Sequence, residues 1–144
     1  MRINEMDLIH YGNSSFDVGK IRPIINIGRE KPAGGLWTSP TSSKYGWADW
    51  CIDAEYYDCS KKDSFIVQLK SSSRVCIIDS LEDLLELPLI GEFKDKLDFE
   101  LLATMCDAIW LTEQGQKETH LSYPVNLYGW DCESVLIMNP KCIS

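Results

Sequence analysis

Two acidic side chains, Asp131 and Glu133, stand one residue apart directly before the apolar run of residues 135–138. Because side chains alternate between the two faces of a strand, residues spaced by two share a face, and both carboxylates are predicted to point the same way. Burying a carboxylate without a partner costs free energy, so such a pair is typical of a solvated edge, a hydrogen-bonded site or a ligand site. The two acids are therefore either solvated at a loop-to-strand transition or directed at a ligand.

Two further candidates come from the first third of the chain. A strand predicted over residues 6–11 ends at Gly12 and carries His10 near its end, where the histidine either hydrogen-bonds within the core or contacts a ligand. A second strand, predicted over residues 34–40, begins with two glycines and ends with a proline. Those glycines either let a ligand approach the backbone closely or form a tight turn or bulge.

The six cysteines are spread along the chain without the density of a disulfide scaffold, so they are predicted to be reduced. No two have Cys-x-x-Cys spacing and neither histidine stands near a cysteine pair, so no metal site is predicted. An alternative chemistry is that of a thiol hydrolase, with Cys132 as nucleophile and His120 as base. The acids on both sides of Cys132 argue against it, because like charge disfavours the thiolate and raises the thiol pKa.

Composition limits the classes of partner. The chain has 144 residues, which predicts one domain over residues 1–144 with one core. Its formal charge of -8 opposes attraction to nucleic acid and to anionic membranes. The first residues form no apolar signal segment, and no window approaches the roughly 18 apolar residues of a membrane helix. A soluble, cytoplasmic protein is predicted.

Strands alternate with few helices along the chain, which predicts an α+β fold with a compact, mixed, mostly antiparallel sheet. The long connection over residues 13–34 contains one brief predicted strand, residues 24–27, and its length is typical of a functional loop. A helix predicted over residues 44–58 has an apolar stripe at three- and four-residue spacing, which predicts a buried face. The stripe consists of Trp47, Trp50, Cys51, Ala54 and Tyr57.

The middle of the chain predicts a hairpin and a capped helix. Residues 64–69 and 74–78 are apolar runs on either side of a polar segment, the pattern of two strands joined by a loop. Ser80 with Asp83 three residues later predicts the start of a helix, which ends before Pro88.

The last third predicts a helix over residues 97–105, a short buried strand over residues 108–111 and an exposed loop over residues 112–120. The inward face of the helix is predicted to consist of Phe99, Leu102 and Ala103. The loop is predicted because the segment is polar and contains a glycine. The strand that carries the acid pair then closes the fold.

Three separated pieces follow one another in the order of a known family pattern: Leu8-Ile9-His10-Tyr11-Gly12, then Gly35-Leu36-Trp37-Thr38-Ser39, then the strand entered through Asp131 or Glu133. Together they resemble the ADP-ribosyltransferase-like fold in its histidine, aromatic, acid variety. This fold is shared by poly-ADP-ribose polymerases, diphtheria-type toxins and many small bacterial and phage proteins. The resemblance covers most of the chain and implies a split sheet.

The resemblance implies NAD as co-substrate and transfer of ADP-ribose to a macromolecule with release of nicotinamide, as in a toxin or a phage counter-defence effector. A protein acceptor is favoured over nucleic acid, and the oligomeric state is left open. Positive charge develops on the ribose as the bond to nicotinamide breaks, so a carboxylate near the 2'-hydroxyl stabilises the transition state. Glu133 better matches the usual glutamate, whereas Asp131 lies nearer the aromatic turn. The alternative is a catalytically silent member that sequesters a nucleotide or blocks a protein partner.

The resemblance also implies roles for individual residues. His10 matches the histidine that hydrogen-bonds the adenosine ribose, and the Gly12 backbone would lie beside the carboxamide of nicotinamide. Trp37 stands where the family has tyrosine, either to stack on a flat ring or as part of the core. The implied ligand-binding residues are His10, Tyr11, Gly12, Gly35, Leu36, Trp37 and Ser39. The candidates for the second tyrosine of the family are Tyr45, Tyr56 and Tyr57.

Overall fold

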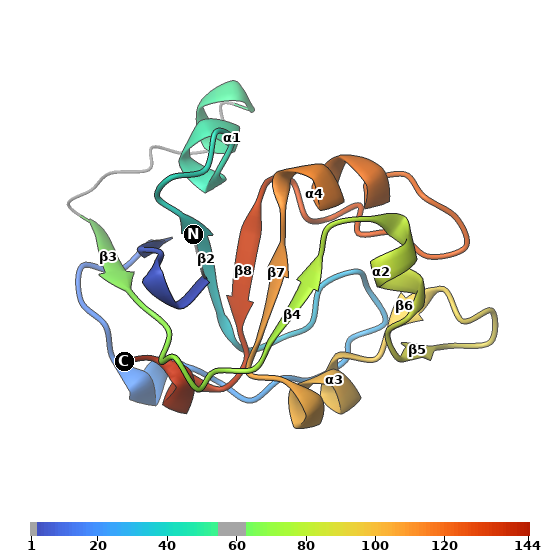
Figure 1. Ribbon diagram of the computed structural model, residues 1–144, viewed down its shortest axis with the longest axis horizontal. Coiled ribbons are helices and arrows are strands. Elements are labelled where there is room, and N and C mark those ends of the chain that lie inside the picture. The colour runs from blue at the N-terminus through green and yellow to red at the C-terminus, as the bar shows by residue number, and fades with distance from the viewer. Residues whose placement is uncertain (1–2, 55–62) are drawn as a thin grey trace.

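The computed structural model describes residues 3–54 and 63–144 (Figure 1). Its strands are β1 (Leu8–Tyr11), β2 (Leu36–Pro40), β3 (Ser64–Val67), β4 (Val75–Ile78), β5 (Leu89–Ile90), β6 (Lys96–Leu97), β7 (Ala108–Leu111) and β8 (Ser134–Ile137). Its α-helices are α1 (Trp47–Asp53), α2 (Leu81–Leu85), α3 (Phe99–Met105) and α4 (Glu113–Thr119). The predicted α+β class is confirmed.

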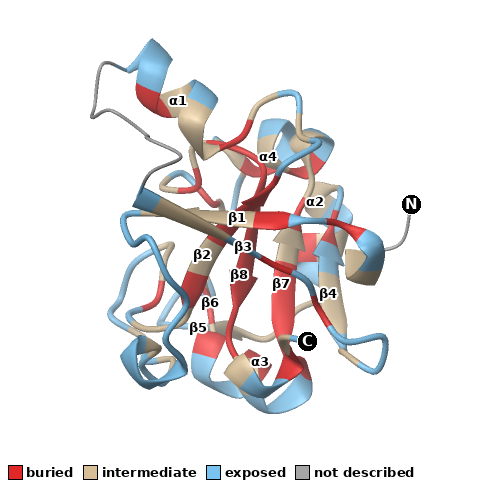
Figure 2. Ribbon diagram, turned by 90° about the vertical axis from the view of Figure 1, so that its left-hand side faces the viewer, coloured by how far each residue is buried: buried red, intermediate tan, exposed pale blue. Residues whose placement is uncertain are grey.

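Six strands form one sheet in the order β3-β1-β2-β8-β7-β4, and β5 pairs with β6 in a separate ribbon. All pairs in the large sheet are antiparallel except β4 with β7. Strand β2 belongs to both parts of this sheet, because its last two residues pair with β1 and its first three pair with β8. Figure 2 shows β1 and β3 crossing in front of the other strands, so the sheet is folded along β2.

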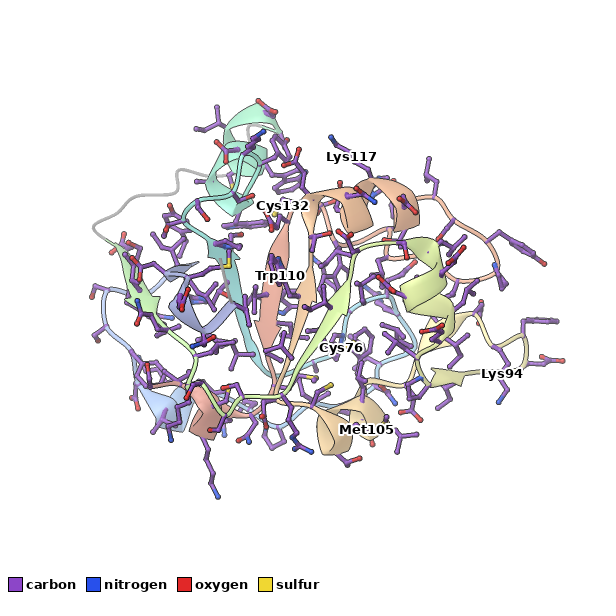
Figure 3. All side chains as sticks on the ribbon, viewed as in Figure 1. Cys76, Lys94, Met105, Trp110, Lys117 and Cys132 are labelled. Carbon is purple, nitrogen blue, oxygen red and sulfur yellow. The ribbon has the colours of Figure 1, made fainter. Side chains whose placement is uncertain are left out.

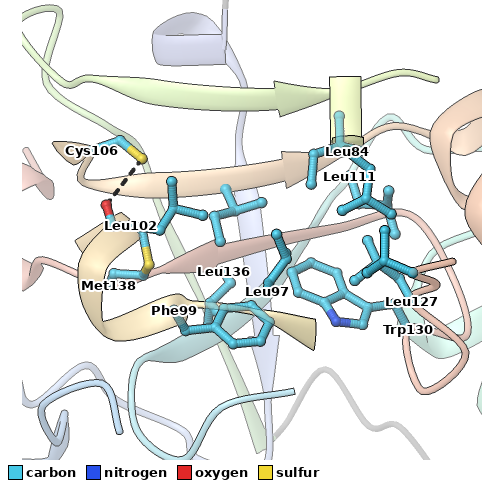
Figure 4. Packing of buried hydrophobic residues seen from close by; sticks show 13 residues of the cluster. Leu84, Leu97, Phe99, Leu102, Cys106, Leu111, Leu127, Trp130, Leu136 and Met138 are labelled. Carbon is cyan, nitrogen blue, oxygen red and sulfur yellow. Dashed lines mark hydrogen bonds between the residues drawn. The ribbon is translucent and has the colours of Figure 1, made fainter. Parts of the chain in front are cut away.

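Two apolar clusters lie on opposite sides of the part of the sheet formed by β2, β8, β7 and β4. The first lies beneath β1 and β3 and consists of Met6, Leu8, Leu36, Val67, Leu69, Ala108, Val135, Ile137 and Cys142. The second lies against α2 and α3 and includes Leu84, Phe99, Leu102, Leu111, Trp130 and Leu136 (Figure 4). The alternation along β8 divides its apolar residues between the two, which explains why every residue of that strand is buried.

Asp107 joins the start of β4 to the end of β8. Its Oδ2 accepts a hydrogen bond from Arg74 N at 2.8 Å, and its Oδ1 accepts one from Asn139 Nδ2 at 3.0 Å. Its backbone carbonyl accepts another from Met138 N at 2.8 Å. Burial raises the pKa of this carboxyl, but the hydrogen bonds and the Arg74 charge outweigh it, and the pKa lies below its ordinary value.

The predicted hairpin over residues 64–78 is wrong. Strand β3 lies at one edge of the sheet and β4 at the other, where β4 runs parallel to β7. The chain that leaves β3 pairs instead with the C-terminal segment: Leu69 forms a bridge with Ile143, and Lys70 N donates to Cys142 O at 2.7 Å. These backbone groups therefore obtain their partners from a segment far along the chain.

The predicted loop over residues 112–120 is also wrong, because α4 occupies it. Thr112 caps this helix, since its hydroxyl accepts a hydrogen bond from Gly115 N at 3.0 Å. A β-carbon on Gly115 would overlap the carbonyl oxygen of Ile78 at the end of β4. This glycine permits close packing of helix on strand and does not interrupt the helix.

Two more expectations are corrected. The helix predicted over residues 44–58 is the shorter α1, within which Cys51 is buried, while Ala54 just beyond it is exposed; residues 55–58 lie outside the described part. The brief strand over residues 24–27 is reduced to one bridge between Ile25 and Ala33. By contrast, β7, the capped α2 and the inward face of α3 are confirmed.

Asp107 accepts hydrogen bonds from Arg74 N and Asn139 Nδ2 through its two carboxylate oxygens. In Asp107→Asn an amide NH2 replaces one of these oxygens and faces a donor, so one buried hydrogen bond is lost. We expect a loss of about 1–3 kcal/mol in the free energy of unfolding at pH 7. Because the folded-state pKa is depressed, the stabilisation by Asp107 is present above its unfolded pKa of about 3.9 and is lost as the pH falls. Urea unfolding at pH 7 and pH 3 measures this, with the exposed Glu92→Gln as control. An equal loss at both pH values would contradict it.

Candidate functional site

The backbone pairing of β1 with β2 stops at Ile9 and Ser39. At the next residue a side chain replaces the backbone, because His10 Nδ1 lies 2.7 Å from the carbonyl oxygen of Trp37. A carbonyl can only accept, so Nδ1 carries a proton, and in the neutral ring Nε2 is left as an acceptor. Phe65 packs against the imidazole, with ring centroids 5.1 Å apart. The two strands diverge from this hydrogen bond onward.

A cleft of about 230 Å³ lies where β1 and β2 diverge. Its lining residues come from β1, β2, the start of α1, the end of the 13–34 connection and the segment before β8. They are Ile9, His10, Tyr11, Lys31, Trp37, Thr38, Ser39, Trp47, Trp130, Asp131, Cys132 and Ser134. Figure 3 shows one of them, Cys132, at the upper end of β8 near α1. The cleft thus collects residues from distant parts of the sequence.

Tryptophans form much of the wall. Trp37 meets Trp130 edge to face, with ring centroids 4.7 Å apart, and Trp130 is 1% exposed. Trp130 Nε1 donates to the carbonyl of Glu30 at 2.7 Å, which fixes the end of the 13–34 connection beside the cleft. Trp47 stacks on Trp50 at the first turn of α1. Trp37 was expected either to stack on a ligand ring or to belong to the core. It packs on the core and also lines the cleft.

Asp131 is the carboxylate of the cleft. It is half-buried, and burial raises its pKa above the ordinary value although the nearby charges of Lys31 and His120 act to lower it. Ionising this group in the folded protein therefore costs free energy. A carboxylate kept in such a position is typical of functional sites.

The Glu133 side chain contacts β7 and is not among the described residues that line the cleft. It is 8% exposed, and its Oε2 accepts a hydrogen bond from Trp110 Nε1 on β7 at 2.9 Å. Its carbonyl accepts from Ser39 Oγ at 3.0 Å. The expectation that both acids share a face is wrong, because β8 begins only at Ser134 and strand alternation does not extend back to Asp131.

The structure brings five of the predicted site residues to the cleft: His10, Tyr11, Trp37, Ser39 and Asp131. Gly12, Gly35, Leu36 and Glu133 are not among its described lining residues. Gly12 N donates to the carbonyl of Asp63 at 2.7 Å, and Gly35 N donates to that of Arg22 at 2.9 Å. A β-carbon on Gly35 would lie 2.8 Å from Leu136 Cδ1, so the glycine pair serves a tight turn packed on β8.

Sequence reasoning missed Lys31, Trp47 and Trp130 as lining residues. The excess of tryptophan was a signal for the two indoles, whereas nothing in the sequence distinguishes Lys31 from a surface lysine. Of the three candidates for the second family tyrosine, Tyr45 is not among the described lining residues, and its hydroxyl donates to Asp53 Oδ2 at 2.9 Å. Burial and this partner raise the pKa of Tyr45 to about 12. The other two candidates, Tyr56 and Tyr57, lie outside the described residues.

The thiol chemistry has little support. Cys132 is 2% exposed, and burial raises the pKa of its thiol, although polar contacts with the Ser134 and Ser39 hydroxyls act to lower it. His120 stacks on the Tyr128 ring and its Nδ1 lies 3.4 Å from Gln116 Nε2. The described contacts of the two residues therefore do not form a nucleophile and base pair.

Compared with family models, with curated proteins and with solved structures, the chain gives no match. Within residues 3–54 and 63–144, no group of three or more His, Cys, Asp or Glu side chains could hold a metal ion. No helix in the same residues has the length and apolar character needed to cross a membrane. The site is therefore interpreted from its own geometry.

Replacing Asp131 by Asn should stabilise the protein at neutral pH, because it removes a charge that the folded state disfavours. The folded-state pKa is raised, so wild-type stability is greatest below the unfolded pKa of about 3.9 and falls as the pH rises through the folded value. Melting temperatures at pH 7 and pH 3 test this: the gain should be present at pH 7 and absent at pH 3. Glu133→Gln is the matched control, and it should not stabilise. Destabilisation by Asp131→Asn at pH 7 would contradict the assignment.

Proposed function

We propose that this protein binds NAD in the cleft and transfers ADP-ribose to a partner macromolecule, as a mono-ADP-ribosyltransferase of the histidine, aromatic, acid variety. One observation carries the proposal. His10, Trp37 and Asp131, from three separated segments, line a single cleft at the point where β1 diverges from β2. The fold, six strands folded along β2, is compatible with the split sheet that the resemblance implies.

The three side chains suit the three demands of the reaction. His10 Nε2 is an acceptor for a ribose hydroxyl, because Nδ1 already donates to Trp37 O. The Trp37 ring offers a face for a flat aromatic group. Asp131 places negative charge where positive charge develops on the ribose as the bond to nicotinamide breaks. In this proposal Asp131 is the catalytic carboxylate. Glu133 positions the segment before β8, because its carboxylate accepts from Trp110 and its carbonyl accepts from Ser39.

A wider groove of about 620 Å³ adjoins the cleft, and the two hollows share Ile9, Tyr11, Ser39 and Trp47 as lining residues. Ligand pockets are typically about 300 to 1,000 Å³, so the cleft alone is too small for a whole dinucleotide. The groove provides room beside it. Its wall includes the acids Asp7 and Asp49, which favour a protein acceptor over nucleic acid.

A second candidate is a catalytically silent protein that binds the nucleotide or blocks a partner. Two groups that the resemblance assigns to the ligand are already used within the protein. Gly12 N donates to Asp63 O, and the Glu133 carboxylate accepts from Trp110 Nε1. Because both groups are engaged within the protein, these two hydrogen bonds favour a protein that does not turn over NAD.

Nicotinamide release from NAD, together with calorimetric NAD binding, separates the two candidates. For a transferase, Asp131→Asn should lower the rate by about 100-fold or more with little change in affinity, because it removes charge stabilisation of the transition state. The matched change Glu133→Gln should keep most of the rate. Binding without release by the wild type, also with protein extracts as acceptor, would leave only the silent candidate. Absence of NAD binding would exclude the transferase and the NAD-binding form of the silent candidate, and would leave a protein that blocks a partner.

Replacing His10 by Asn or by Gln separates its structural role from its ligand role. Asn retains a donor near the Nδ1 position and loses the Nε2 acceptor, so the melting temperature should be maintained while NAD affinity falls about 3- to 10-fold. Gln cannot donate from the Nδ1 position, so it should lower the melting temperature. Calorimetry and thermal unfolding measure the two effects. Unchanged NAD affinity in His10→Asn would contradict the ligand role.

A further inference from the structure

Lys31 extends across the wall of the cleft. Its Nζ lies 5.3 Å from the centroid of the Trp37 ring, in the geometry of a cation-π contact. Its stem runs along Gly129, where an added β-carbon would lie 3.5 to 3.8 Å from three of the stem carbons. The lysine is half-buried, so it is not a freely solvated surface residue.

The backbone on both sides of Lys31 is held in place. The carbonyl of Glu30 accepts the hydrogen bond from Trp130 Nε1, and Pro32, the next residue, is buried. The ammonium interacts electrostatically with Asp131. Among the described lining residues Lys31 is the one Lys or Arg, so a single cation on an aromatic face shares the cleft with a single carboxylate.

An aromatic face next to a carboxylate is an arrangement that recognises organic cations. We propose that Trp37 and Asp131 form a subsite for an organic cation, and that Lys31 occupies this subsite as an internal competitor that the ligand must displace. The inference rests on and deepens the proposed function, because the nicotinamide ring of NAD is a pyridinium cation. Simple cations can test it without NAD.

The charge of Asp131 explains why Lys31 lies in the subsite. Without Lys31 in the subsite, the partly desolvated Asp131 would lose the larger of the two positive charges that act on it, which is unfavourable. Lys31 supplies that charge. When the ribose bond breaks, its electron pair leaves with the nicotinamide nitrogen, so the released ring is neutral and loses its attraction to the subsite. Lys31 then regains the Trp37 face, which favours departure of the product.

The test compares binding of the cation 1-methylnicotinamide, which is methylated on the ring nitrogen, with binding of neutral nicotinamide by calorimetry at pH 7.5. Lys31→Met keeps the stem against Gly129 and removes the charge, so it should bind the cation about 3- to 10-fold more tightly than wild type. Lys20→Met is the matched control, because Lys20 is exposed and outside the cleft, and it should leave the affinity unchanged. Lys31→Arg keeps a cation that can lie on the ring and should resemble wild type.

Three outcomes would overturn the inference. Weaker or unchanged cation binding by Lys31→Met would show that Lys31 assists the ligand or has no influence on it. An equal gain for neutral nicotinamide would show that the variant only creates space. No cation binding by wild type or variant would remove the subsite altogether, whereas NAD could still bind, so failure here is distinguishable from failure of the proposed function. Melting temperatures establish that each variant is folded.

Discussion

The hydrogen bond from His10 Nδ1 to the carbonyl of Trp37 marks the point on which the rest of the site depends. Up to Ile9 the strands β1 and β2 satisfy one another through the backbone. Beyond it, β1 continues along β3 while β2 continues along β8. The backbone N–H and C=O groups that the two strands no longer exchange need other partners. The imidazole supplies one of them. The cleft exists because the sheet is divided there, and the same hydrogen bond orients the ring nitrogen that remains for a ligand.

Two partly desolvated aspartates show how this fold treats charge differently in its frame and in its cleft. Asp107 receives hydrogen bonds from Arg74 and Asn139, and its pKa is lowered although burial opposes this. Asp131 is also desolvated, but its neighbours compensate less, and its pKa is raised. The first carboxylate stabilises the fold in its charged form, and the second is held at a cost. Residues that lower stability while lining a hollow are commonly those on which function depends.

Much of the fold could be predicted from the sequence, because local patterns determine it. Glycine and proline bound β2, and the Ser80 cap with its acid three residues later sets the start of α2. The errors in the predicted hairpin and in the predicted loop share one cause, which is that the deciding contact lies far along the chain. The partner of the segment after β3 is the C-terminal segment near Ile143, and the reason for Gly115 is the nearby carbonyl of Ile78.

In the candidate site, too, some residues could be predicted from local patterns and others depend on distant contacts. His10 and Trp37 were singled out by short motifs, and Asp131 as one of two acids before an apolar run. The choice between the two acids could not be predicted, since it depends on the residue at which β8 begins. Lys31 was invisible because its place beside Trp37 depends on the path of the whole 13–34 connection. That path is determined by contacts such as the one between Glu30 and Trp130.

The wall between the cleft and the adjoining groove has a thermodynamic consequence. Ile9, Tyr11, Ser39 and Trp47 face both hollows, and the Ser39 hydroxyl both donates to the Glu133 carbonyl and accepts from Trp47 N at 3.0 Å. An occupant of one hollow that displaces this wall changes the shape of the other. Linkage then requires reciprocity: whatever factor the first occupant imposes on the affinity of the second, the second imposes on the first. Two ligands that displace this wall would therefore not bind independently, even without touching each other.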